Sequence, residues 1–176
     1  EANQLNKSRG IFLDDLGNIY VADRYNHRIQ KWTPGSSVGI TVAGGNGNGD
    51  SLNQTGSPTN VFVDKEGNVY VSESSNNRVT KWKLGASEGI IVAGGNGSGD
   101  AKNQLGIQIM GVFVDDDQNV FVSDSWNHRI QKWAFGASEG ITVAGGNGEG
   151  SRANQLNKPY EFTITDDGDF IINDRF

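Results

Sequence analysis

The stretch that decides the fold is GNIYVAD at residues 17–23, followed by NHRIQKW at residues 26–32. Versions of it return at residues 67–82 and 118–133. Its closing tryptophans, Trp32, Trp82 and Trp133, are separated by 50 and then 51 residues. A fixed period of this length is typical of repeat architectures, in which each repeat is one supersecondary unit. The sequence therefore predicts a tandem array.

Two further markers keep the same register. The string AGGNG starts at Ala43, Ala93 and Ala144, and an Asn-Gln pair stands at residues 3–4, 53–54, 103–104 and 154–155. These markers divide the chain into units of about 1–50, 51–100 and 101–151 and an incomplete unit 152–176. We expect residues 1–176 to form one repeat segment.

The first unit has four short apolar stretches, at residues 11–13, 19–22, 28–32 and 40–43. The first two are joined by Asp-Asp-Leu-Gly-Asn, a sequence that suits a tight hairpin. Four antiparallel strands per unit fit a β-propeller blade, whose repeat in a related class is about 40 to 45 residues long. The predicted fold is all-β. A β-solenoid is the competing architecture, but its coils are usually shorter and lack such hairpins.

Residues 17–23 and 26–32 resemble the NHL repeat, a family named for its Asn-His-Leu signature, and residues 118–124 and 127–133 resemble it too. The second copy has Asn77 in place of His, and Glu73 where the family has Asp. The resemblance implies about three and a half NHL-type blades, a partial ring of a six-bladed propeller. The fourth unit stops after its second strand, near Phe176, and an open sheet edge invites pairing. We expect a segment of a longer chain, or a subunit whose ring is completed by partners or further copies of itself.

Composition narrows the class of partner. The net charge of −6 and the pI of about 4.8 disfavour phosphate backbones, so nucleic acid is an unlikely partner. The chain has no cysteine, which excludes disulfides and thiolate metal sites. We expect no membrane span, because no apolar run approaches about 20 residues. The first residues do not resemble a signal peptide.

Three positions recur in each complete unit, nine residues in all, with roles that the blade itself needs. The acidic residue after the second strand and the arginine that opens the third have the types of a charge-assisted pair. The tryptophan that closes the third strand has the type of a core anchor. These positions are Asp23, Arg28, Trp32, Glu73, Arg78, Trp82, Asp124, Arg129 and Trp133.

The informative variation lies in the loop after the second strand. In a propeller this loop and the connector between blades lie on one rim, where ligands usually bind. Tyr25 and Trp126 have flat faces that suit a sugar ring or a peptide side chain, or they cover a neighbouring blade instead. The candidate ligand-face residues are Arg24, Tyr25, Ser74, Ser75, Ser125 and Trp126.

The sequence offers little catalytic chemistry. His27 and His128 are too few for a zinc site, and no Ser/His/Asp set stands apart from the repeat, so we expect no catalytic residue and no cofactor. The acidic turns leave calcium as a lesser alternative, although hairpin chemistry explains them. The AGGNG string lacks the Lys-Ser/Thr of a phosphate loop. Three N-glycosylation sequons begin at Asn6, Asn53 and Asn96.

The leading hypothesis is a non-catalytic binding or scaffolding module, extracellular, that binds a protein or carbohydrate or builds a repetitive assembly. The alternative is a metal-dependent propeller enzyme, similar to the six-bladed lactonases or the amidating lyase, with further ligands outside this segment. A minor alternative is RNA binding through a basic rim, as in other NHL proteins.

Overall fold

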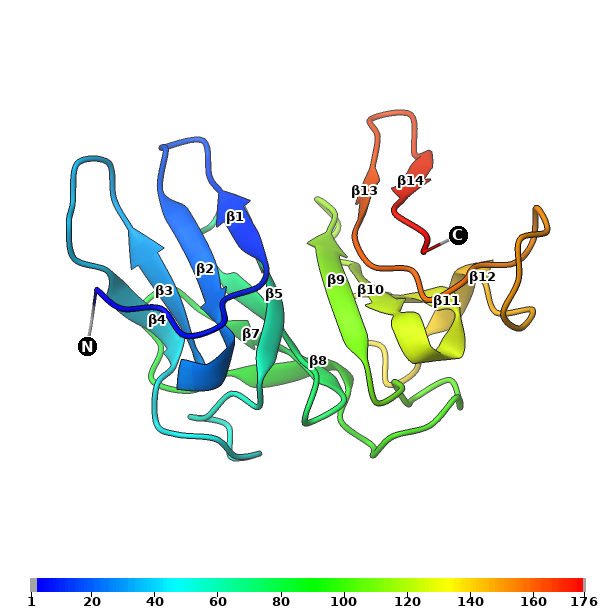
Figure 1. The fold of residues 1–176 in the computed structure, drawn as a ribbon, viewed down its shortest axis with the longest axis horizontal. Helices are drawn as coiled ribbons and strands as arrows, with labels where there is room; N and C mark the ends of the chain where they lie inside the picture. Colours follow the sequence, from blue (N-terminus) through cyan, green and yellow to red (C-terminus); the bar gives the residue numbers. More distant parts are fainter. Residues whose placement is uncertain (1–2, 176) are drawn as a thin grey trace.

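The computed structural model describes residues 3–175, so the last residue of the incomplete unit, Phe176, lies outside the described residues. It contains three four-stranded antiparallel sheets and one two-stranded sheet, each with its strands in chain order. Figure 1 shows the sheets following one another from blue to red. The predicted all-β fold is confirmed.

The strands form three four-stranded blades and a two-stranded half-blade. Blade 1 contains β1 (Ile11–Leu13), β2 (Ile19–Asp23), β3 (Arg28–Trp32) and β4 (Ile40–Gly44). Blade 2 contains β5 (Pro58–Val63), β6 (Val69–Glu73), β7 (Arg78–Trp82) and β8 (Ile90–Gly94). Blade 3 contains β9 (Ile109–Val114), β10 (Val120–Asp124), β11 (Arg129–Trp133) and β12 (Ile141–Gly145). The half-blade contains β13 (Phe162–Ile164) and β14 (Phe170–Ile172). Single 3₁₀ turns, η1 (Arg24–Asn26) and η2 (Ser125–Asn127), follow β2 and β10.

The β1–β2 hairpin shows why the sequence turns where it does. The carboxylate of Asp14 accepts hydrogen bonds from the backbone N–H of Leu16 and of Asn18, at 3.0 and 2.8 Å. Gly17 has a φ of 77°, a left-handed conformation that glycine adopts without steric cost. The same side-chain bonds recur at Asp64 in blade 2. This turn chemistry is local. Blade 3 keeps the bond from the N–H of Asn119 to Asp115, and in the half-blade the hydroxyl of Thr165 accepts the N–H of Asp169 instead.

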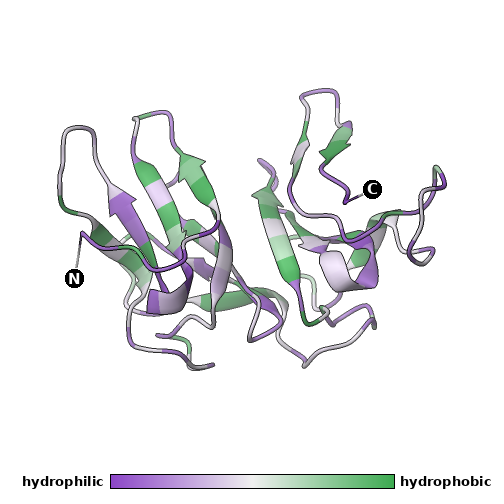
Figure 2. Cartoon of the chain, in the orientation of Figure 1, coloured by the Kyte–Doolittle hydropathy of each residue, from purple (hydrophilic) through white to green (hydrophobic). Residues whose placement is uncertain are grey.

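The hydrophobic core lies between the blades. The face of blade 1 that points forward along the chain buries Tyr20, Ala22, Ile29 and Ala43. It packs against the rear face of blade 2, formed by Val61, Val63, Val69, Val71 and Trp82. An equivalent core joins blades 2 and 3 and includes Trp133. Figure 2 shows the apolar stripes along the strands and the polar loops at their ends.

The rear face of blade 1 is uncovered among the described residues. Ile11, Leu13 and Ile19 are 67%, 64% and 44% exposed. Their counterparts in blade 2 are 2 to 6% exposed, because the forward face of blade 1 covers them.

The innermost strands β1, β5, β9 and β13 lie side by side in this order, so the blades share one axis.

Two ends of the blades carry different loops. The hairpin end holds the turns between first and second and between third and fourth strands, residues 14–18, 33–39, 64–68, 83–89, 115–119, 134–140 and 165–169. The connector end holds residues 3–10, 24–27, 45–57, 74–77, 95–108, 125–128, 146–161 and 173–175. In Figure 1 the β1–β2 and β13–β14 hairpins point to the top, and η1 and the first connector lie at the bottom.

Candidate binding surface at the connector end

A buried carboxylate organises the connector end of each complete blade. In blade 1, Asp23 accepts the backbone N–H of Asn6 at 2.7 Å, the amide of Asn26 at 2.9 Å and the Nε of Arg28 at 2.8 Å. The Asp23 side chain is fully buried. Asp124 makes the corresponding three bonds in blade 3. The carboxylate therefore ties the loop after the second strand to the segment that enters the first.

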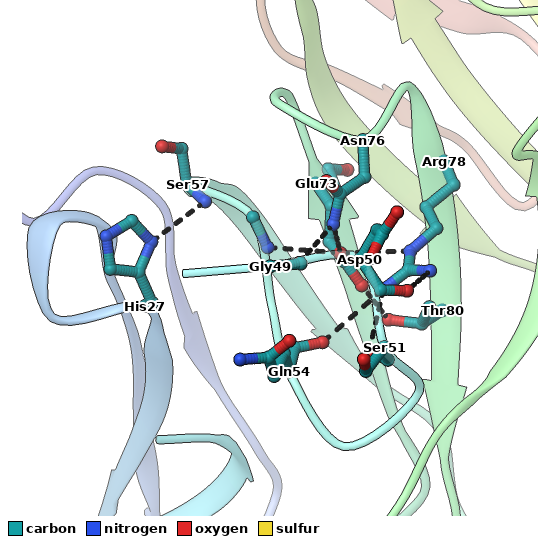
Figure 3. Close-up of polar contacts among 12 residues, drawn as sticks. His27, Gly49, Asp50, Ser51, Gln54, Ser57, Glu73, Asn76, Arg78 and Thr80 are labelled. Atoms are coloured by element: carbon teal, nitrogen blue, oxygen red, sulfur yellow. Dashed lines mark hydrogen bonds and ion pairs between the residues drawn. The ribbon is translucent and has the colours of Figure 1, made fainter. Parts of the chain in front are cut away.

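The arginine partner holds the connector that arrives from the preceding blade. Arg78 donates from Nη1 to the carbonyl of Asp50 at 2.6 Å, and from Nη2 to the carbonyls of Ser51 and Gln54 at 3.3 and 3.4 Å (Figure 3). Arg129 repeats the pattern one blade later. These guanidinium groups point inward and have their donors occupied, so their role is to shape the surface.

The connector is further braced by its own amides. The side chain of Asn46 donates to the carbonyl of Asn53 at 2.7 Å, and the side chain of Gln54 donates to the carbonyl of Asn46 at 2.8 Å. The same pair of bonds closes the next two connectors. The glycine-rich segments are thus fixed, and a fixed surface loses little entropy on binding.

The histidines join neighbouring blades. The Nδ1 of His27 accepts the backbone N–H of Ser57 at 3.2 Å, and the Nδ1 of His128 accepts the backbone N–H of Lys158 at 3.3 Å (Figure 3 shows the first). Both histidines have a left-handed backbone conformation, with φ of 52° and 53°, and Asn77 has the same conformation in blade 2. Sequence reasoning missed this role. The signal was available, because Asn and His are among the side chains that tolerate positive φ.

The structure places Tyr25 and Trp126 at the surface, 46% and 50% exposed. Each ring has a cation over it. The Nζ of Lys7 lies 4.8 Å from the centre of the Tyr25 ring, and the Nζ of Lys158 lies 5.5 Å from the centre of the Trp126 ring. Arg24 adds a second cation beside Tyr25, at 5.5 Å. The rings are therefore sites of combined aromatic and positive character.

The serine candidates differ from one another. Ser75 is exposed, Ser74 donates its hydroxyl to the carbonyl of Ile107, and Ser125 is only 1% exposed. The exposed surface of the loops thus consists of the Tyr25 and Trp126 sites, with small side chains between them in blade 2.

The sequon asparagines have exposed side chains. The amide of Asn96 donates to the carbonyl of Asn103 at 2.9 Å as part of the connector bracing. The hydroxyl-bearing residue of the second sequon, Thr55, is fully buried. The first sequon asparagine, Asn6, is fixed through its backbone N–H on Asp23.

The shared axis holds one asymmetric cluster that the repeat pattern did not predict. Equivalent positions in or just before the four inner strands carry Gly10, Asn60, Gly111 and Glu161. The amide of Asn60 donates to both carboxylate oxygens of Glu161, at 2.8 and 2.7 Å. Partial desolvation raises the pKa of Glu161, and the Asn60 hydrogen bonds oppose that shift, although the residue as a whole is exposed. These residues are 101 positions apart, so only the fold brings them together.

Two grooves open at the hairpin end, one at each junction between complete blades, and equivalent residues line both of them. The larger has a volume of about 780 Å³ and is lined by Tyr70, Trp133 and Phe135, among others. Its counterpart of about 480 Å³ is lined by Tyr20, Trp82 and Leu84.

Within residues 3–175 there is no group of three or more His, Cys, Asp or Glu side chains that could hold a metal ion. No helix in that range is long and apolar enough to cross a membrane.

Comparison with known proteins shows NHL repeats in two of the blades. The family model for the NHL repeat matches residues 8–32 and 111–133, which lie in blades 1 and 3. These are the blades that carry His27 and His128, whereas the unmatched blade 2 has Asn77 and Glu73. A search of curated proteins found no match.

Several solved structures share the fold at low identity. A Bacteroides thetaiotaomicron protein of unknown function aligns with a TM-score of 0.72 and 18% identity, over 95% of this chain and 44% of that one. A streptogramin B lyase aligns with a TM-score of 0.65 and 13% identity, over 95% and 48%. A nidogen/laminin complex aligns with a TM-score of 0.69 and 16% identity, over 95% and 56%.

The chain spans about half the length of these solved structures. At such identities the likeness shows the fold alone. With the family match and the sheet topology, it shows that the chain contains NHL repeats and has a β-propeller-type fold.

Proposed function

We propose that the chain is a non-catalytic binding module and that its connector end is the surface that contacts the partner. The observation that carries this proposal is the pairing of exposed Tyr25 and Trp126 with Lys7, Arg24 and Lys158. Exposed aromatic rings supply contact area at low entropic cost, and nearby cations select a partner with negative charge.

The bracing around these rings supports the same proposal. Asp23 and Asp124 fix the loops that carry Tyr25 and Trp126. Hydrogen bonds from side-chain amides fix the connectors that lie between these loops. A rigid surface with a few varied side chains is typical of recognition by loops on a stable scaffold. The partner we expect is an acidic protein or an acidic carbohydrate. Protein contact also accords with the nidogen/laminin complex among the similar folds.

The extracellular location remains part of the proposal. It is supported by the three sequons, whose asparagine side chains are all exposed. Expression in a secretory host, followed by intact-mass measurement with and without an endoglycosidase, tests it. A protein of unmodified mass from that host would contradict it.

Binding is tested with two defined polyanions, poly-L-glutamate and polygalacturonate. We expect one of them to bind, with affinity reduced at least about tenfold in a Tyr25→Ser, Trp126→Ser double variant. Serine is what blade 2 carries at this position, in Ser75. Leu84→Ser, at the opposite end, is the matched control and should bind as the parent does. Absence of binding to both polymers, or equal loss in the control, would contradict the proposal.

A second candidate is an enzyme with its site on the axis, and the asymmetric pair of Asn60 and Glu161 favours it. A lyase for streptogramin B has a similar fold. Turnover of a streptogramin B, lost in Glu161→Gln, would support this candidate over the binding module. An RNA-binding module is the remaining alternative, and salt-sensitive retention of single-stranded RNA would favour it.

A further inference from the structure

The two ends of the blades carry opposite electrostatic character. The loops of the hairpin end have two lysines: Lys65 is paired with Asp116 at 2.7 Å, and Lys83 is exposed. A third lysine, Lys81 on β7, reaches this end, where its Nζ lies 3.9 Å from the carboxylate of Asp64. Its carboxylates are far more numerous. They are Asp14, Asp15, Asp64, Glu66, Glu88, Asp115, Asp116, Asp117, Glu139, Asp166, Asp167 and Asp169.

The connector end has the reverse excess outside its Asp/Glu–Arg pairs. Its cations are Lys7, Arg9, Arg24, Lys102, Arg152, Lys158 and Arg175. Its carboxylates are Asp50, Asp100, Glu149, Glu161 and Asp174. The excess is small, but three of the cations stand over the two exposed rings. The positive character is therefore concentrated where the contact area is.

The hairpin end also carries exposed apolar side chains. Leu16, Leu84 and Phe135 are 80%, 76% and 73% exposed, the highest values for large apolar side chains among the described residues. They stand on turns of blades 1, 2 and 3, and Leu84 and Phe135 border the two grooves. Exposed apolar side chains gathered on one end of a soluble domain mark an interaction surface.

We propose that the connector end binds the hairpin end of a second copy of the chain, so that copies stack end to end. This rests on the connector end being the binding surface. Aromatic rings with cations meet apolar tips with carboxylates. The rings lie on blades 1 and 3, and the apolar tips stand on blades 1, 2 and 3 of the same arc. The larger groove beside Phe135 of one copy can accommodate the indole of Trp126 of the next copy against apolar side chains.

The geometry of the contact predicts an open stack. Because the two interacting surfaces are different and lie at opposite ends, each added copy presents a fresh hairpin end. Pairing of two hairpin ends is opposed by their carboxylates. Screening by salt should weaken the stack, since its charged groups are exposed.

Light scattering or sedimentation velocity over a range of concentration tests the proposal. In about 20 mM salt we expect species larger than a dimer that grow with concentration, and in about 500 mM salt a shift towards monomer. A connector variant, Tyr25→Glu with Trp126→Glu, and a hairpin variant, Leu84→Lys with Phe135→Lys, should each be monomeric. Ile171→Lys alters a side chain on β14 that is 61% exposed and lies away from both ends, and it should stack as the parent does.

Mixing the two variants gives the sharpest result. Each retains one intact end, so an equimolar mixture should form a 1:1 complex and nothing larger. A parent chain that stays monomeric in low salt at about 100 μM overturns the stacking proposal. So does association that persists in both variants, because the contact would then lie elsewhere, as on the rear face of blade 1. A monomeric parent that binds poly-L-glutamate through Trp126 refutes stacking and leaves the binding module intact.

Discussion

Replacing Glu73 of blade 2 by the aspartate of the other two blades should destabilise the chain. A second substitution, Thr80→Gln, should restore the lost stability. Blade 2 pairs the long Glu73 with the short Thr80. At the same two positions blades 1 and 3 have a short acid and a long amide, Asp23 with Gln30 and Asp124 with Gln131. The combined length of the side chains at these two positions is thus similar in all three blades.

The cost of Glu73→Asp follows from what the carboxylate touches. Glu73 is fully buried, and its Oε1 accepts the hydroxyl of Thr80 at 2.6 Å (Figure 3). Shortening the side chain by one methylene withdraws that oxygen, and losing a buried hydrogen bond to a charged group costs about 1.5 to 3 kcal/mol. The vacated methylene adds about 1 kcal/mol. We expect a total of about 2 to 4 kcal/mol.

The partner change should have its own cost and then cancel the first. Thr80→Gln beside the unchanged Glu73 overfills the site, at about 1 to 3 kcal/mol. With Glu73→Asp in place, the longer amide fills the space as it does in blades 1 and 3. The double variant should lie within about 1 kcal/mol of the parent, which gives a favourable coupling energy of at least about 2 kcal/mol.

Urea unfolding followed by far-UV circular dichroism measures the free energy of unfolding of the parent, the two single variants and the double variant, which together form a double-mutant cycle. Fluorescence is less suitable, because the Nε1 of Trp82 donates to Thr80 at 3.0 Å and would report the substitution itself. Glu73→Asp combined with Thr163→Gln, an exposed site on β13, is the control and should be additive within about 0.5 kcal/mol. A double variant no more stable than the sum of its single changes refutes the length matching.

Three further predictions concern single residues. Asp14→Ala should cost about 1 to 2 kcal/mol at neutral pH and its exposed neighbour Asp15→Ala less than about 0.5. Burial raises the pKa of Asp14, but hydrogen bonds from Asn18 and others outweigh this and hold it below the ordinary 3.8, so its stabilisation is present above that pH and lost as pH falls further. Urea midpoints at neutral pH and near pH 2.5 should show the gap narrowing, and a constant gap would contradict this. His27→Ala should cost about 1 to 2 kcal/mol and His27→Asn less, because asparagine tolerates the left-handed backbone; equal losses in thermal unfolding would argue against the conformational account. Gly10→Ala places a Cβ 2.7 Å from the Cα of Asn60 and should cost more than about 2 kcal/mol, whereas a parent-like melting temperature would show that the inner strands can shift.

The blades could be predicted from sequence because their signals are local. The Asp14 turn, the alternation of strands and polar segments and the spacing of Trp32 and Trp82 all lie within one unit or one period. The partners of these residues could not be predicted in the same way. The sequence suggests that Asp23 pairs with Arg28, five residues on, but not that Asp23 also accepts the N–H of Asn6.

The candidate site was predictable in part. Variation in the loop after the second strand pointed to Tyr25 and Trp126, and both are exposed. Lys158 lies over Trp126 from the next unit, a contact that depends on how one blade packs on another. The meeting of Asn60 with Glu161 depends on the curvature of the whole arc, which no local pattern encodes.

The histidine bond between blades has a consequence for how such chains grow. His27 and His128 accept from the main chain of the following unit, where Ser57 stands in one case and Lys158 in the other. The contact therefore does not depend on the side chain that follows. A duplicated or transposed copy of the repeat would find its donor already in place, so the number and order of units can change by recombination without a matching mutation at the joint.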